Sequence, residues 1–138
     1  MYGELMMVAL VWNLATTEQL LTTPGVVLMN PVEARIVEKT NAERRRHGLH
    51  PLEVDGQLVR SARKHTAWMT RSRSLTHTTK AVGENIAMGQ RSSQEAVRSW
   101  MNSSGHRANI LSSGYRKIGV AAYTGTDGTV YWCQQFLR

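Results

Sequence analysis

The order in which helix patterns and strand patterns follow one another along the sequence constrains the fold most strongly. Helix starts come first: Asn30-Pro31-Val32-Glu33 and Ser92-Ser93-Gln94-Glu95 have capping-box residues, and Asp55 can cap a helix between them. The tail then alternates apolar residues over 118–122 and 130–136, on either side of the turn residues Asp127-Gly128. Helices that precede a hairpin, with no strand–helix–strand rhythm, predict an α+β fold in which helices pack on an antiparallel sheet.

Four helices and one polar loop are expected in the first part of this pattern. Gly48 suits the left-handed end of the first helix, and Arg44-Arg45-Arg46 lies in its last turn, where positive charge interacts favourably with the helix dipole. We prefer this structural explanation of the arginines to a binding patch. The helices are predicted over residues 31–47, from Asp55 to about Met69, over 92–102 and from Ser104 or Gly105 to Ile110, with a loop over 70–82.

Cys133 is the only cysteine of the chain. It excludes an intramolecular disulfide and a cysteine-rich zinc site. On the second hairpin strand it faces away from Trp132 and Phe136, which share the expected core face, so we interpret it as structural. The 138 residues, 41% of them hydrophobic, suffice for one domain without disulfides, and secretion is not excluded.

The charge balance favours anionic partners. The net charge is +7, which suits a phospholipid, an acidic cell-wall polymer or a nucleic acid, although a merely soluble basic protein has the same balance. No nucleic-acid motif is present, so a specific nucleic-acid partner is not expected. We expect a monomer.

Residues 1–30 form a separate region in our interpretation. They contain the apolar run 5–12, which is far too short to span a bilayer, so no transmembrane span is expected. No positive residue precedes this run and no good cleavage site follows it. We interpret residues 1–30 as a leader remnant or an extra packed element, and residues 31–138 as the domain.

Three polar residues are the main candidates for chemistry: His77, Glu84 and His106, with His65 behind them. Two imidazoles could bind Zn²⁺ or another divalent cation, with Glu84 as general base or as acceptor of a histidine hydrogen bond. The alternative is structural. Glu84 and Asn85 can lock a loop by hydrogen bonds to nearby backbone, and His65 is more simply a hydrogen-bonded core histidine.

Five ordered motifs resemble the CAP superfamily of cysteine-rich secretory, antigen 5 and pathogenesis-related 1 proteins, in its compact bacterial SCP-like branch. The resemblance covers residues 31–138. Its motifs are Asn41-Ala42-Glu43-Arg44 with Gly48-Leu49 and Pro51-Leu52; His77 after the second helix; Gly83-Glu84-Asn85-Ile86-Ala87; residues 100–111 with Ser-Gly-His-Arg-Ala-Asn-Ile-Leu; and Ile118-Gly119-Val120 with the strand from Tyr131 to Phe136.

The resemblance implies a three-layer α-β-α sandwich with a central antiparallel sheet. It also implies a cleft that larger members line with two histidines and two glutamates, some of which bind zinc through the histidines. His77 and His106 match the histidine positions and Glu84 matches the first glutamate. Ser103 stands where the second glutamate would fall, which weakens any mechanism that needs paired carboxylates.

Three functions follow as expectations. Because family members are mostly secreted, the first is a secreted or envelope-associated module that binds a lipid-like or anionic cell-wall ligand through a His/Glu-lined cleft. The second is a metal-dependent hydrolase in which His77 and His106 hold Zn²⁺ and Glu84 assists. The third is a structural or interaction domain in which these residues only stabilise the fold. Fold transfers from a resemblance more safely than function does, so the choice rests on the geometry of the site.

Overall fold

The computed structural model describes residues 27–138 and contains four helices and four strands within them. The apolar run 5–12, and all but the last four residues of the predicted region 1–30, lie outside the described residues. The elements are α2 (Pro31–Arg46), β1 (Glu53–Val54), α3 (Gly56–Ser72), β2 (Gly83–Met88), α4 (Ser93–Met101), α5 (Ser104–Ile110), β3 (Lys117–Thr124) and β4 (Val130–Leu137).

The strands form one sheet in the order β1-β3-β4-β2. The predicted hairpin is confirmed, because β3 and β4 pair antiparallel with Ala121 opposite Cys133, and the Asp127 carboxylate accepts a hydrogen bond from the Thr129 amide in the turn. Two features differ from the prediction. The sheet is mixed, since the two-residue β1 pairs parallel to β3, and the segment interpreted as a loop around Glu84 is the edge strand β2, antiparallel to β4.

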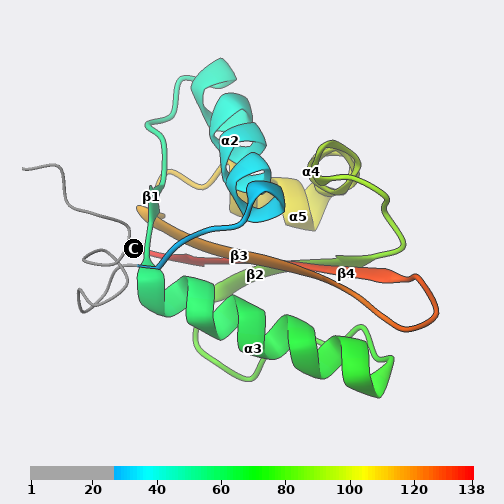
Figure 1. The fold of residues 1–138 in the computed structure, drawn as a ribbon. Helices are drawn as coiled ribbons and strands as arrows, with labels where there is room; N and C mark the ends of the chain where they lie inside the picture. The colour runs from blue at the N-terminus through cyan, green and yellow to red at the C-terminus, as the bar shows by residue number, and fades with distance from the viewer. Residues whose placement is uncertain (1–26) are drawn as a thin grey trace, which may run out of the picture.

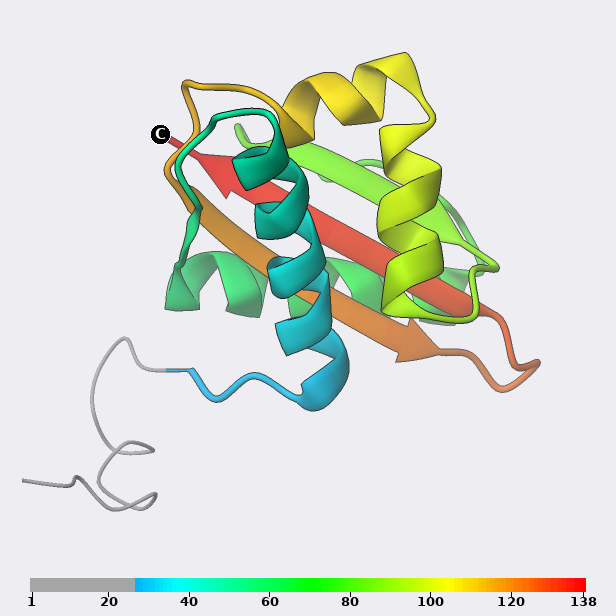
Figure 2. The same ribbon diagram turned by 90° about the horizontal axis from the view of Figure 1, so that it is seen from above.

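The helices cover both faces of the sheet and produce three layers. Figure 1 shows α3 on one face and α2, α4 and α5 on the other, and Figure 2 shows these three helices lying across the strands. The α-β-α arrangement predicted from the family resemblance is confirmed.

Each face of the sheet has its own apolar core. Trp132 and Phe136 of β4 point to the face covered by α2, α4 and α5, where Ile36 and Trp100 also lie. Cys133, which is buried, points to the α3 face. Alternate residues of a strand face opposite sides, so the predicted separation of Cys133 from the two aromatic residues is confirmed.

The helix caps follow the sequence with small differences. Asn30 and Glu33 form the predicted capping box, and Asp55 caps α3. Ser92 caps α4, but the Glu95 carboxylate accepts its hydrogen bond from the Arg91 amide instead of the cap residue, so this capping box is incomplete. Helix α3 also extends three residues into the predicted loop and ends at Ser72.

Arg44 has a role that the sequence interpretation missed. Its guanidinium is buried and donates hydrogen bonds to the backbone carbonyls of His50, Ile110 and Ser112. The arginine therefore ties the end of α2 to the end of α5, which is a stronger reason for its position than the helix dipole alone. Arg45 and Arg46 are exposed.

Gly119 sets how closely α3 approaches the sheet. A Cβ atom at this position would lie 2.1 Å from the carbonyl carbon of Leu58 and 2.4 Å from the amide nitrogen of Val59. Both are backbone atoms of α3, so only glycine permits this contact. The close approach places the start of α3 directly against β3.

Candidate functional site

Glu84 is the centre of the candidate site and is almost fully buried at the edge of the sheet, with 3% of its side chain exposed. Its Oε1 accepts hydrogen bonds from His77 Nδ1 at 2.8 Å and from the Thr78 amide at 2.9 Å. Its Oε2 accepts a hydrogen bond from Gln135 Nε2 at 2.9 Å. Buried charges in proteins are stable when they are bonded in this way.

These bonds attach the loop after α3 to the sheet. His77 and Thr78 lie in residues 73–82, the segment between α3 and β2, whereas Gln135 lies on β4. The Glu84 carboxylate therefore joins the loop to two strands. We call residues 73–82 the α3–β2 loop.

Cys133 lies beside the same carboxylate without being activated by it. Its Sγ is 3.7 Å from Glu84 Oε2. Burial, reinforced by the nearby Glu84 charge, raises the pKa of the Cys133 thiol well above its usual value. A thiol that keeps its proton is a poor nucleophile.

Asn85 faces the opposite side of the sheet and positions α5. Its Nδ2 donates to Gln134 Oε1 at 2.8 Å and to the His106 carbonyl at 3.0 Å, and its Oδ1 accepts from Asn109 Nδ2 at 2.9 Å. Two consecutive residues of β2 thus fix two layers: Glu84 holds the α3–β2 loop, and Asn85 holds the helix that carries His106.

The structure brings the three predicted residues together around the β2 edge, but only one pair is in direct contact. His77, with 61% of its side chain exposed, contacts Glu84, whereas His106 is linked to β2 through its backbone. Burial, and secondarily the neighbouring His77, lower the pKa of His106. Ser103 is the N-cap of α5, although its side chain makes no capping hydrogen bond, and it supplies no carboxylate.

The donor set does not fit a catalytic zinc centre. Within residues 27–138, no three His, Cys, Asp or Glu side chains converge in a way that could hold a metal ion. His77 uses Nδ1 for Glu84, which leaves its Nε2 and the ring of His106 as the available nitrogens. Two protein ligands are one fewer than catalytic zinc sites use.

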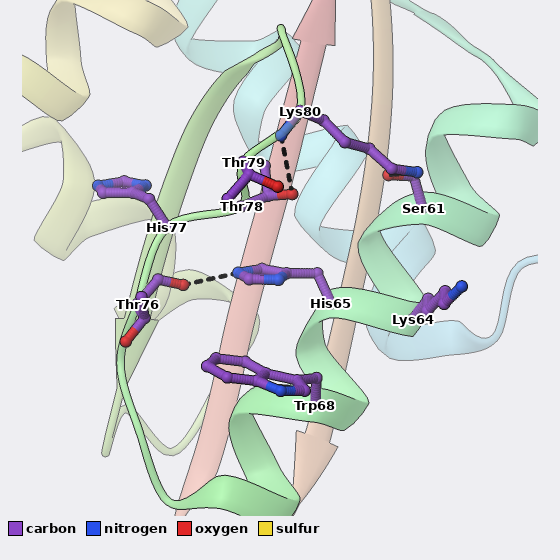
Figure 3. Close-up of a pocket in the computed structure, with 9 residues that line it drawn as sticks. All are labelled: Ser61, Lys64, His65, Trp68, Thr76, His77, Thr78, Thr79 and Lys80. Carbon is purple, nitrogen blue, oxygen red and sulfur yellow. Dashed lines mark hydrogen bonds between the residues drawn. The ribbon is translucent and has the colours of Figure 1, made fainter.

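A pocket of about 490 Å³ lies between α3 and the α3–β2 loop. Figure 3 shows its residues, with Trp68 and His65 projecting from α3 toward the loop. The indole and imidazole rings stack, with centroids 5.8 Å apart and planes 12° apart. The lining residues are Ser61, Lys64, His65, Trp68, Thr76, His77, Thr78, Thr79 and Lys80.

This pocket contains His77 but neither Glu84 nor His106, and sequence reasoning missed most of it. His65, interpreted as a core residue, is in fact partly exposed in its wall, and its Nε2 bonds to the Thr76 carbonyl at 2.6 Å. One signal was present in the sequence. Trp68 falls outside the apolar face that contains Leu58 and Met69, so the sequence pattern itself predicts an exposed indole on α3.

No helix within residues 27–138 is both long and apolar enough to cross a membrane.

Comparisons with known proteins identify the family. The model of the CAP, or cysteine-rich secretory protein, family matches residues 37–136. The Bacillus subtilis protein YkwD is 37% identical over 133 residues, which cover 84% of this chain and 51% of YkwD.

Solved structures share the fold. An extracellular protein of Bacillus anthracis with an SCP domain superposes with a TM-score of 0.70 at 25% identity, over 81% of this chain and 45% of that one. An outer surface protein of Borrelia burgdorferi also has a TM-score of 0.70, at 21% identity, over 81% of this chain and 96% of that one. This chain spans about half the length of the Bacillus relatives. It belongs to the CAP family and is related to extracellular bacterial SCP-domain proteins.

Proposed function

We propose that this domain is an extracellular binding module that holds an anionic ligand of the cell surface in the pocket between α3 and the α3–β2 loop. The ligand carries phosphate or carboxylate groups, as cell-wall polymers and lipid headgroups do. Relationship to an extracellular SCP-domain protein supports the location. The composition of the pocket supports the ligand class.

The charge of the pocket carries this proposal. Lys64 and Lys80 are among its lining residues, and no Asp or Glu is part of the lining. Both lysines are exposed, and Lys80 Nζ lies 3.2 Å from the Ser61 hydroxyl, which directs it across the pocket. A concave site lined by charges of one sign concentrates ligands of the opposite sign.

Glu84 supports a binding role over hydrolysis. A general base must reach the proton that it removes, and its oxygens must be free to accept that proton. Both oxygens of Glu84 already accept protein hydrogen bonds, and the side chain is buried. The second glutamate of larger CAP proteins is replaced by Ser103. The His77–Glu84 pair therefore supports the wall of the binding pocket, which combines the structural and the binding interpretations.

Co-sedimentation tests the proposed function. The protein should sediment with phosphatidylglycerol vesicles or with purified cell wall that contains teichoic acid, but not with phosphatidylcholine vesicles. Retention on the anionic vesicles would indicate a lipid headgroup as the ligand, and retention on the cell wall would indicate a cell-wall polymer. Retention should fall as salt rises, because exposed charges are screened. EDTA should leave retention unchanged, since no step uses a metal. Equal retention on neutral vesicles, or loss of retention in EDTA, would contradict the proposal.

A further inference from the structure

The indole of Trp68 is an unusual feature of the pocket, because it is 44% exposed yet held in a fixed orientation. The His65 ring supports one side of it by stacking. His65 is itself fixed by its hydrogen bond to the Thr76 carbonyl. The result is a flat apolar platform that is already ordered before a ligand binds, which lowers the entropy lost on binding.

The surface of the pocket is mostly apolar, and several hydroxyl-bearing residues are part of its lining. Ser61, Thr78 and Thr79 line it together with the two lysines, and Figure 3 shows the threonines on the loop opposite α3. Such a lining combines mostly apolar surface with several hydroxyl groups and two lysines. It suits a ring that has one apolar face for the indole and many hydroxyl groups at its rim, which is the surface of a pyranose sugar.

We infer that the pocket is a saccharide site: a sugar ring stacks on Trp68 while Lys64 and Lys80 bind an acidic substituent of the same or the next ring. This inference rests on the proposed function and narrows the anionic ligand to an acidic glycan. The volume of about 490 Å³ lies within the range of pockets for small ligands, about 300–1,000 Å³.

The part of this site that lies on the α3–β2 loop depends on His77 and Glu84, two of the residues predicted from the sequence. The bonds from His77 and Thr78 to Glu84 hold the loop that carries Thr79 and Lys80. The buried carboxylate is therefore a positioning residue for the saccharide site, and it does not touch the ligand.

Isothermal titration calorimetry of the full chain with two tetrasaccharides tests the inference. Hyaluronan tetrasaccharide alternates N-acetylglucosamine with glucuronate, whereas chitotetraose contains N-acetylglucosamine alone and is neutral. We expect the acidic sugar to bind about tenfold more tightly, as the combined effect of two exposed ammonium groups that each contribute a few-fold. Replacing both lysines, Lys64→Gln with Lys80→Gln, should remove this preference.

Variants of Trp68 separate stacking from charge. Trp68→Ala should weaken binding of the acidic sugar by about tenfold, which corresponds to about 1.4 kcal/mol, because the sugar loses its stacking surface. Trp68→Phe keeps a ring and should retain most of the affinity. Met88→Ala is the control, because Met88 is 49% exposed on β2 and does not line the pocket. Thermal unfolding of each variant confirms that it is folded.

The two proposals can fail separately. Equal binding of both sugars, or full binding by a folded Trp68→Ala variant, would overturn the saccharide inference. If neither sugar binds while salt-sensitive retention on an anionic surface persists, the saccharide inference fails and the proposed function stands. If retention is also lost, both fail.

Discussion

Glu84→Gln is the most informative single substitution, because it removes the charge and changes almost no volume. The carboxylate accepts three hydrogen bonds of 2.8–2.9 Å, two on Oε1 and one on Oε2. A glutamine has only one oxygen, so its NH₂ group must face either the loop donors or the Gln135 donor. Either orientation removes at least one bond and places two donors against each other.

The size of the effect follows from these contacts. A hydrogen bond to a charged acceptor contributes about 1.5–3 kcal/mol, and the other bonds weaken when the charge is lost. Removing a buried charge also relieves part of its desolvation cost. We therefore expect a net loss of about 2–3 kcal/mol in the free energy of unfolding. For a domain of this size that corresponds to a fall in Tm of roughly 10 °C.

Two assays measure this effect. Urea unfolding gives the change in stability, and amide hydrogen exchange should show that the Thr78 N–H loses protection more than amides in α2 do. Glu38→Gln is the matched control, because Glu38 is exposed on α2, and its stability should stay within about 0.5 kcal/mol of the parent. Equal stability of the two variants, with Thr78 still protected, would refute the role of Glu84 as the anchor of the loop.

Three further predictions concern the framework of the site. Gly119→Ala places a Cβ against α3 backbone and should cost about 3 kcal/mol or more in urea unfolding; a loss below about 1 kcal/mol would contradict the close approach. Arg44→Met leaves the Ile110 and Ser112 carbonyls without this donor and should lower the free energy of unfolding by about 3 kcal/mol, with faster amide hydrogen exchange in α5. Unchanged exchange in α5 would refute the tie between α2 and α5. The pKa of His106 is lower in the folded protein than in the unfolded chain, so the unfolded chain takes up the proton at higher pH and stability that is present above about pH 6.5 is lost as the pH falls. His106→Asn should therefore flatten the decline in Tm between about pH 7.5 and 5.5. An unchanged slope would contradict this prediction.

Local signals in the sequence predicted the helices and the hairpin well, because caps and turns act over a few residues. Asn30 and Asp55 cap as expected, and Asp127-Gly128 forms the turn. Strand β2 was missed because Glu84, Asn85 and Ile86 are all buried, so the strand shows no alternation of apolar and polar residues. The parallel strand β1 depends on a partner more than sixty residues away, which no local pattern encodes.

The candidate site was predicted only in part, because its contacts join residues that no local sequence pattern connects. The motifs pointed to His77, Glu84 and His106, but the bond between His77 and Glu84 depends on the path of a whole loop. The pocket itself requires knowledge of which face of α3 stays uncovered. Trp68 and Lys64 become neighbours of Lys80 only after the α3–β2 loop folds back over the helix.

Charge-matched variants test the central claim, that the pocket between α3 and the α3–β2 loop binds the anionic ligand. Lys64→Gln with Lys80→Gln removes two charges from the pocket, and Arg45→Gln with Arg98→Gln removes two exposed charges from α2 and α4, on the opposite face of the sheet. Both double variants have the same net charge. The measurement is retention on the anionic surface that the parent binds, across a salt series. The account predicts that the lysine variant loses most of its retention and the arginine variant keeps it, and equal loss in both would contradict a defined site.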